Sequence, residues 1–320
     1  MSLENILALM ALVASFITCH YARPLCSSLS LMDLPNARKL HAVPTPLAGG
    51  IVLALAGIPA SLAFIFLSSD IDTWTITQIR YLTALLAMAL LGIIDDRHAL
   101  SPRSRLLFSF LIFILLATID PTFRLRTLDF YYLDFQLGLV NVPIAVIFTA
   151  FCCVALINAV NMADGKNGLV IGMSIGWLCL LLLRTDPAIS PLIKIIIAIL
   201  IPLLIFNLRG KLFLGDGGAY GLATSIALLT IITYNMPGPF MRHKIAAEEI
   251  MALFFVPTFD AARLIITRMA QRKSPMAADR NHLHHILLDR FGWPGGLFIY
   301  WILAIVPAAL LILYNSHNGS

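Results

Sequence analysis

Four carboxylates in this sequence lie where long apolar stretches begin or end. They are Asp95, Asp96, Asp164 and Asp216. A single carboxylate in such a place is often only a helix end that meets water. Four of them at three such ends, with Asn and Gly residues nearby, indicate a site for a divalent cation and phosphate groups, because Mg²⁺ prefers oxygen ligands and usually keeps waters and substrate phosphates.

Asp95 and Asp96 are adjacent and precede Arg97. Neighbouring carboxylates repel each other, which favours binding of a cation or uptake of a proton from a phosphate. A solvated loop start, balanced by Arg97, is an equally good interpretation of this pair alone.

The segment from Asn158 to Gly168 is the most informative. Asn158, Asn161 and Asp164 are spaced by three, so a helix would place their polar side chains on one face. Gly165 and Gly168 then permit a tight turn and a close approach of a ligand to the backbone. Helix capping explains one Asn but not the whole set, so the pattern favours a metal and phosphate site.

The segment 213–220 joins a loop to a predicted helix start. Asp216 would lie near the helix N-terminus, beside glycines whose N–H groups can bind phosphate. Phe213 offers a ring face to a nucleobase. The simpler alternative is an Asp N-cap with a packing Phe.

Three histidines follow Arg280, and we predict a short helix over 281–291. On this helix His282 and His285 are neighbours, and with His284 and Arg280 they can bind an anionic pyrophosphate. A zinc site is an alternative, although no cysteine or clear fourth ligand accompanies the histidines. A polar helix end at the membrane surface is a further alternative.

Two other places carry charge. The first loop contains Arg38, Lys39 and His41, which either anchor the loop at a membrane surface or contact substrate. Asp260 lies inside an apolar run, where an ionisable side chain is costly and usually faces a polar interior. Arg263 is one turn away and is its expected partner.

The elements that must position these residues are helices in a membrane. Of the 320 residues 59% are hydrophobic and 12% are charged, whereas soluble domains are about 25% charged. The apolar runs can cross roughly 30 Å of hydrocarbon and do not alternate as barrel strands would. We predict an all-α integral membrane protein with one polytopic domain over 1–320, and a short hairpin between Asp120 and Asn141. About ten spans are expected, over 4–22, 47–67, 76–94, 106–119, 142–160, 169–183, 189–206, 217–234, 246–266 and 296–314.

The distribution of Lys and Arg predicts the orientation. If the first loop is cytoplasmic, most of the 22 Lys and Arg residues lie on the cytoplasmic side. Both termini are then periplasmic or extracytoplasmic, and the four carboxylates lie on the cytoplasmic face. The net charge of +5 therefore indicates anionic lipid or a phosphorylated substrate as partner, and no nucleic acid.

Five segments in order resemble the polyprenyl-phosphate N-acetylhexosamine-1-phosphate transferases, and within this MraY-like superfamily the bacterial WecA/TarO-type branch. They are 33–41, 95–97, 158–168, 215–219 and the His-x-His-His at 282–285. The resemblance covers nearly the whole chain. It implies transfer of N-acetylhexosamine 1-phosphate from a UDP-sugar, by default UDP-GlcNAc, to undecaprenyl phosphate. The products would be UMP and a lipid-pyrophosphate sugar that starts a surface glycan, such as O-antigen, capsule or a teichoic-acid linkage unit.

The resemblance also implies roles in catalysis and metal binding. Asn161 and Asp216 are the expected ligands of Mg²⁺, with Mn²⁺ as the alternative ion. Asp95 is expected to deprotonate or orient the lipid phosphate, with Asp96 beside it. Asp164 is expected to shape the metal and phosphate site.

Further roles concern the sugar nucleotide. Phe213 is expected to stack on uracil, and Asn167 to hydrogen-bond its edge. The residues expected to hold the pyrophosphate are Arg105, Arg280, His282, His284 and His285. Asn158, the three first-loop residues and Asp260 are expected to contact substrate or to be structural.

The chain departs from this family's pattern at several positions. Asn167 and Ala99 stand where bacterial members commonly have Asp, and Arg105 stands where MraY has Lys. MraY also reads His-His-His where this chain reads His-Leu-His-His, which argues against a muramyl-pentapeptide substrate.

Other functions stay open. A modified sugar of the fucosamine or quinovosamine type is an alternative donor, and a transporter of an anionic metabolite or nucleotide sugar is an alternative function, since Asp260 lies in a span. An inactive scaffold is a third. We expect a multi-pass protein of the bacterial cytoplasmic (inner) membrane in contact with its lipids, and leave a homodimer open.

Overall fold

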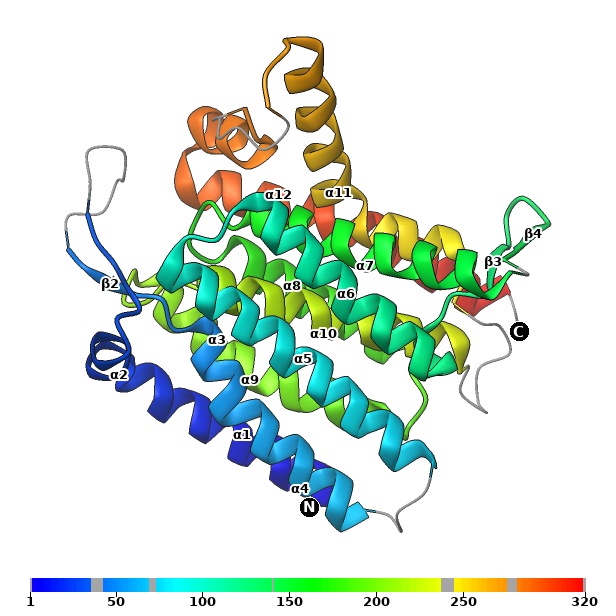
Figure 1. Ribbon diagram of the computed structural model, residues 1–320, viewed down its shortest axis with the longest axis horizontal. Helices are drawn as coiled ribbons and strands as arrows, with labels where there is room; N and C mark the ends of the chain where they lie inside the picture. The colour runs from blue at the N-terminus through cyan, green and yellow to red at the C-terminus, as the bar shows by residue number, and fades with distance from the viewer. Residues whose placement is uncertain are drawn as a thin grey trace. The chain divides into compact units, whose positions relative to one another are not determined.

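The structure is a computed structural model that describes residues 2–35, 43–68, 73–139, 141–236, 245–274 and 281–318. The described chain is mostly helical (Figure 1), with two small two-stranded sheets. It divides into two compact units. Unit 1 comprises Met1–Ile112 and Ala188–Ser225, and unit 2 comprises Phe113–Pro187 and Ile226–Ser320. The position of one unit relative to the other is not determined.

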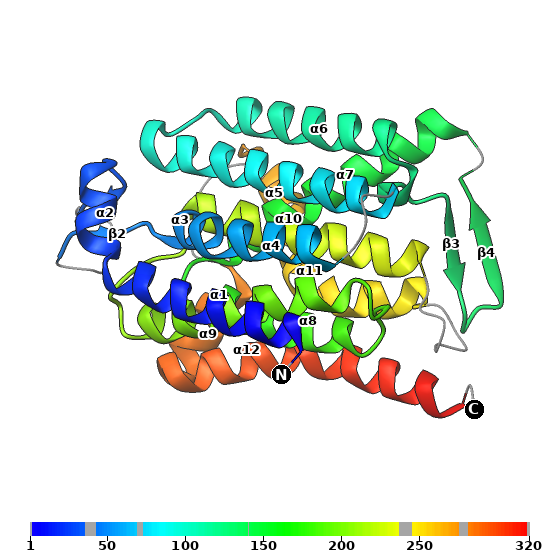
Figure 2. The ribbon, with the colours of Figure 1, turned by 90° about the horizontal axis from the view of Figure 1, so that it is seen from below.

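Unit 1 is built around long helices that pack side by side. Its elements are α1 (Leu3–His20), α2 (Ala22–Ser28), β1 (Met32–Asp33), β2 (Thr45–Pro46), α3 (Gly49–Val52), the π-helical turn η1 (Leu53–Gly57), α4 (Ile58–Ser68), α5 (Thr73–His98), the first part of α6 (Pro102–Ile119), α9 (Ser190–Leu208) and the first part of α10 (Gly215–Asn235). Figures 1 and 2 show α1 beside α9. The buried face of α1 carries Leu7, Ala11, Ser15 and Cys19, and its small residues allow the close approach that membrane helices use.

Two contacts fix where α10 begins. Phe213 N donates to Pro46 O (2.8 Å) and Ala48 N donates to Phe213 O (3.0 Å), so the segment before α10 is held against the chain that follows β2. A Cβ on Gly49 would overlap Leu214 O. Gly49 is therefore needed to position the start of α10.

Unit 2 contains the remaining elements. They are the last part of α6, η2 (Pro121–Phe123), β3 (Thr127–Phe130), β4 (Phe135–Gly138), α7 (Val142–Ala163), α8 (Leu169–Leu182), the last part of α10, α11 (Ala247–Ala270) and α12 (Leu283–Asn318). Strands β3 and β4 pair antiparallel, with Thr127 opposite Gly138, so the predicted hairpin is confirmed. Figure 1 shows α11 change direction along its length, and Pro257 inside the helix supplies the cause.

Helix α12 contains a break. Gly292 has φ 70° and ψ 171°, outside the helical region, so residues 283–291 form a separate helical segment before the apolar remainder of α12. The short helix predicted over 281–291 is confirmed, with its start two residues later. Figure 1 places this segment beside the second half of α11.

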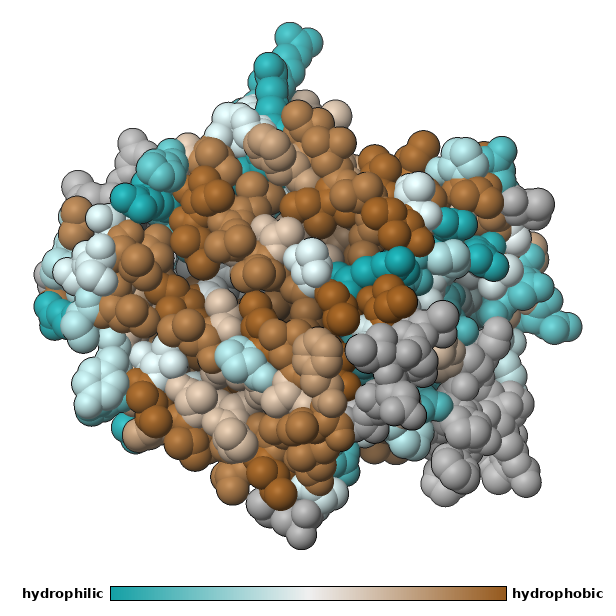
Figure 3. All heavy atoms as spheres, turned by 60° about the horizontal axis from the view of Figure 1, so that its bottom comes forward, coloured by the Kyte–Doolittle hydropathy of each residue, from teal (hydrophilic) through white to brown (hydrophobic). Residues whose placement is uncertain are grey.

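Nine helices of the described ranges are long and apolar enough to cross a membrane, and the shorter apolar helix Leu169–Leu182 matches the sixth predicted span. The view in Figure 3 shows a face covered largely by hydrophobic side chains. Helix α1 alone exposes Leu9, Met10 and Phe16 by half or more. Apolar surface on this scale requires lipid rather than water, so the chain is a multi-pass α-helical membrane protein.

Candidate active site

The first group of polar residues lies in unit 1, where α5 ends and α10 begins. We call Asp95, Asp96, Arg105, Asp216 and Tyr220 the carboxylate cluster. The apolar run of α5 brings the two adjacent aspartates to the last turn of the helix. The glycines of α10 let its first turn approach α5 closely, since a Cβ on Gly92 would overlap the backbone of Asp216.

Asp95 is buried and accepts hydrogen bonds from three donors. Arg105 Nη1 donates to its Oδ2 (2.9 Å) and Leu100 N donates to its Oδ1 (2.8 Å). The Tyr220 hydroxyl donates more weakly to Oδ2 (3.3 Å). A buried carboxylate with this many donors is held in a fixed orientation.

Asp96 caps a helix that is distant in sequence. Its Oδ1 accepts from Asp216 N and its Oδ2 accepts from Gly217 N, both at 2.9 Å. These N–H groups belong to the first turn of α10, which has no intrahelical acceptors for them, and the positive end of the helix dipole favours the negative charge. Asp96 therefore holds α10 against α5 and sets the position of Asp216.

Asp216 is more accessible than Asp95. Its side chain is 28% exposed, and its Oδ2 lies 4.0 Å from Arg105 Nη1. Arg105 thus lies within 4.0 Å of both Asp95 and Asp216 and attracts both carboxylates. An oxygen ligand at a helix N-terminus, next to a guanidinium, is suited to a hard cation and to phosphate oxygens.

The second group lies in unit 2, where α11 meets the start of α12. We call Asp260, Arg263, His282, His284 and His285 the histidine cluster. The rings of His284 and His285 have centroids 4.3 Å apart, and those of His282 and His284 are stacked 5.2 Å apart. Arg263 Nη2 donates to Asp260 Oδ1 (2.7 Å). The cluster brings the three predicted histidines together.

His284 is the unusual member. Its side chain is almost fully buried, with the residue 2% exposed. Among the described residues neither ring nitrogen has a hydrogen-bond partner, although buried polar atoms are nearly always paired. Gly165 lies directly against the ring, because a Cβ there would overlap Nε2. The histidine cluster therefore adjoins the segment 158–168 within unit 2.

That segment turns sharply after α7. Asp164 is the C-cap of α7, and Gly168 has φ 83°, a left-handed value that favours glycine, where α8 begins. Asn158 Nδ2 donates to Val154 O in its own helix (2.7 Å), which favours a structural role for this amide. Asn161, Asp164 and Asn167 are all partly exposed.

Comparison with known proteins finds one matching family model and several similar transferases. The family model "Glycosyl transferase family 4" matches residues 78–234. A Yersinia pestis protein named undecaprenyl-phosphate alpha-N-acetylglucosaminyl 1-phosphate transferase is 29% identical over 302 residues, which cover 91% of this chain and 78% of the relative. A protein of the same name from Escherichia coli (strain K12) is 27% identical over 91% of this chain and 77% of its own length. A Bacillus subtilis (strain 168) protein, named probable undecaprenyl-phosphate N-acetylglucosaminyl 1-phosphate transferase, is 26% identical over 96% of this chain and 85% of its own length.

The part of the chain from residue 78 to residue 234 is similar to glycosyl transferase family 4. The family model spans the carboxylate cluster and the segment 158–168, and the longer matches to the relatives reach beyond it. These three relatives are transferases by name, and none of them supports the transporter alternative.

Four predicted site residues lie outside the described residues: Arg38, Lys39, His41 and Arg280. The predicted metal ligands Asn161 and Asp216 lie in different units, so their pairing stays a prediction.

The described residues contain no group of three or more His, Cys, Asp or Glu side chains placed to hold a metal ion. A magnesium site made from one carboxylate, one amide oxygen, waters and phosphates does not need such a group.

Sequence reasoning missed two features of the site. It assigned no role to Tyr220, whose place one turn after Asp216 was the only available signal. It also grouped Asp96 with Asp95 in catalysis and did not predict that Asp96 caps α10. That cap depends on a contact between residues 120 positions apart in the sequence.

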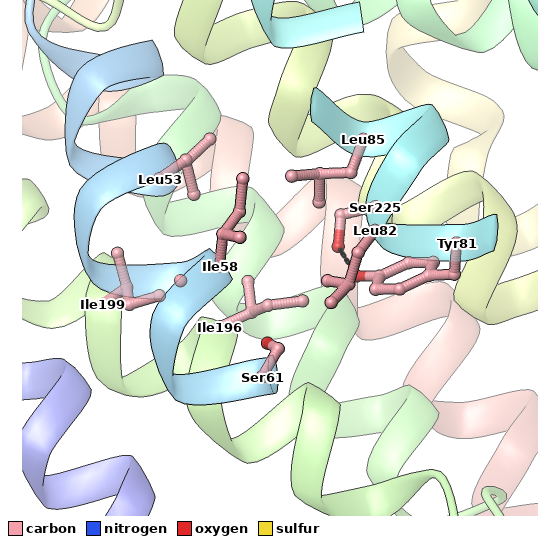
Figure 4. A pocket seen from close by; sticks show the side chains of 10 residues that line it. Leu53, Ile58, Ser61, Tyr81, Leu82, Leu85, Ile196, Ile199 and Ser225 are labelled. Atoms are coloured by element: carbon pink, nitrogen blue, oxygen red, sulfur yellow. Dashed lines mark hydrogen bonds between the residues drawn. The ribbon is translucent and has the colours of Figure 1, made fainter. Parts of the chain in front are cut away.

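Unit 1 also contains a pocket and a buried thiol that belong to neither the carboxylate cluster nor the histidine cluster. The pocket in Figure 4 is lined mostly by apolar side chains such as Leu53 and Ile196, with the Tyr81 to Ser225 hydrogen bond at its wall and no charged residue. The pocket is therefore unsuited to phosphates.

Burial raises the pKa of the Cys26 thiol to about 11, so this thiol stays protonated and is a poor nucleophile.

Proposed function

We propose that this protein transfers N-acetylglucosamine 1-phosphate from UDP-GlcNAc to undecaprenyl phosphate. An oxygen of the lipid phosphate attacks the β-phosphorus of the sugar nucleotide. A new P–O–P bond forms, the bond between the β-phosphorus and the bridging oxygen breaks, and UMP leaves with that electron pair. The names of the relatives support this reaction, and a modified UDP-N-acetylhexosamine is the alternative donor.

The observation that carries the proposal is the carboxylate cluster. A buried Asp95 fixes Arg105 (2.9 Å), and Arg105 in turn lies 4.0 Å from Asp216 at the N-terminus of α10. Arg105 has further N–H donors for the lipid phosphate or the diphosphate. Asp95 orients this cation, which adds a positioning role to the role predicted for it.

The metal proposal rests on the donor set. Asp216 and Asn161 offer the carboxylate and amide oxygens that Mg²⁺ takes, and Asp164 adds negative charge beside Asn161. When bound, Mg²⁺ neutralises the diphosphate and the charge that develops during transfer. Phe213 stacks on the uracil ring, and Asn167 forms a hydrogen bond with the edge of that ring. The histidines of the histidine cluster bind the diphosphate.

The membrane face on which the active site lies follows from the distribution of Lys and Arg among the loops. We place the active site on the cytoplasmic face of the inner membrane, with both termini on the other side, because loops rich in Lys and Arg remain in the cytoplasm.

Two variants test these roles. Asp216→Ala removes the proposed metal ligand, and Asp95→Asn removes the charge that holds Arg105. We expect each to lower UMP release by at least about 1,000-fold with purified protein, undecaprenyl phosphate, UDP-GlcNAc and MgCl₂, since such groups supply several kcal/mol of transition-state stabilisation. Turnover like that of the wild type in both variants would contradict the roles. Exchange of nucleotide sugar across sealed vesicles without a lipid product would favour the transporter.

A further inference from the structure

Asp260 is a buried carboxylate inside an apolar membrane-spanning helix. It is 5% exposed within α11, where an unpaired charge is costly. Both of its oxygens are used. Oδ1 accepts from Arg263 Nη2 (2.7 Å) and from Leu283 N (3.1 Å), and Oδ2 lies 3.1 Å from His282 Nδ1.

The contact with His282 fixes where that ring carries its hydrogen. An ionised carboxylate can only accept a hydrogen bond, so Nδ1 must carry a hydrogen whether the ring is neutral or cationic. Nε2 is then the nitrogen left for another group, with a lone pair in the neutral ring and an N–H in the cation. A carboxylate that sets a histidine in this way is the arrangement of catalytic triads and metal sites.

The same carboxylate also fixes the backbone ahead of the histidines. Leu283 N belongs to the first turn of α12 and donates to Asp260, which is the acceptor that a helix start requires. Arg263 Nη2 also donates to Asn281 O (2.5 Å). Residues 281–283 are thus tied to α11 by three separate contacts, and His284 stacks on the ring that Asp260 holds.

We propose that Asp260 is a positioning residue of the transferase: it holds the hydrogen of His282 on Nδ1, fixes the start of α12, and so presents His282 Nε2 to the anionic part of the substrate. This inference rests on the proposed function. Asp260 acts through His282 and does not itself contact the substrate.

A double-mutant cycle tests whether Asp260 acts through His282. Asp260→Asn keeps an acceptor for Leu283 N, but its NH₂ can donate to Nδ1 and move the ring hydrogen to Nε2. We expect Asp260→Asn to lower kcat by about 10- to 100-fold, and to have less than a twofold effect when His282→Ala is already present. Asp289→Asn is the matched control, because Asp289 is exposed on the same helical segment, and it should leave kcat unchanged. An equal loss from Asp260→Asn in both backgrounds would overturn the inference.

A second measurement does not depend on turnover. Nuclear magnetic resonance of protein labelled with ¹⁵N-histidine in lipid nanodiscs reports which ring nitrogen carries hydrogen, and the His282 signal is assigned as the one lost in His282→Ala. We expect a hydrogen-bonded Nδ1–H in the wild type and its loss in Asp260→Asn. An unprotonated Nδ1 in the wild type would overturn the inference even if the protein is an active transferase. The expected signal in a protein without transferase activity would support the geometry and overturn the proposed function instead.

Discussion

The carboxylate cluster and the histidine cluster satisfy their polar atoms in different ways. In the first, Asp95 and Asp96 use both of their oxygens on donors from the protein. In the second, Asp260 is equally well paired, but His284 is buried with two ring nitrogens that have no partner among the described residues. The carboxylate cluster is therefore held in place by its own contacts, whereas the histidine cluster contains two buried ring nitrogens that the described residues leave unpaired.

This difference means that the two clusters should fail in different ways when mutated. A residue that supports the carboxylate cluster should affect stability and turnover together, because its contacts hold helices. A residue of the histidine cluster that lacks a protein partner should affect turnover alone.

Among the variants that compare the two clusters, the largest effect is expected for Asp96→Asn. The new NH₂ would face a backbone N–H of α10, and one buried donor would lose its acceptor at a cost of about 1–3 kcal/mol. Since Asp216 then moves with the helix start, we expect turnover to fall by about 100-fold or more. Melting followed by intrinsic fluorescence should show a Tm lower by a few degrees. An unchanged Tm would contradict the capping role.

The next effect sharpens the contrast. His284→Leu replaces two unpaired buried nitrogens with apolar atoms of similar volume, so we expect Tm to stay within about two degrees or to rise. Loss of the ring should lower turnover by roughly 10- to 100-fold, since side chains that stabilise transferred phosphoryl groups contribute on this scale. A fall in Tm as large as that of Asp96→Asn would remove the difference between the two clusters.

The smallest effect is expected for Tyr220→Phe. The hydroxyl is a distant donor to Asp95 at 3.3 Å, while two shorter bonds remain. Its removal should cost about 0.5–1 kcal/mol and change turnover by less than about fivefold, as measured by initial rates of UMP release. A loss above 30-fold would mean that Asp95 is less rigid without this donor than its other contacts indicate.

The helices and their order could be predicted from the sequence because a lipid environment leaves the backbone few choices. Each apolar run must satisfy its own N–H and C=O groups, so hydropathy alone locates the spans. The hairpin after Asp120 and the separate segment before Gly292 were also predicted, since polar and turn-forming residues interrupt the apolar pattern there.

The polar contacts of the site could be predicted only in part. The sequence placed the carboxylates at helix ends and the histidines on one short helix, because both follow from local spacing. The cap that Asp96 provides for α10 and the bond from Asp260 to His282 depend on which helix faces pack together. That packing joins residues far apart in sequence and follows from small residues such as Gly92, which no local pattern pairs with a partner.

The most direct test of the proposed transfer is mass spectrometry of the lipid product. Purified protein would be incubated with undecaprenyl phosphate, a panel of UDP-N-acetylhexosamines and MgCl₂, with Asp216→Ala as the control. We expect undecaprenyl diphosphate linked to N-acetylglucosamine, formed in equal amount to UMP and absent in the control. Folded, monodisperse wild-type protein that forms no lipid-linked sugar from any donor would contradict the assignment.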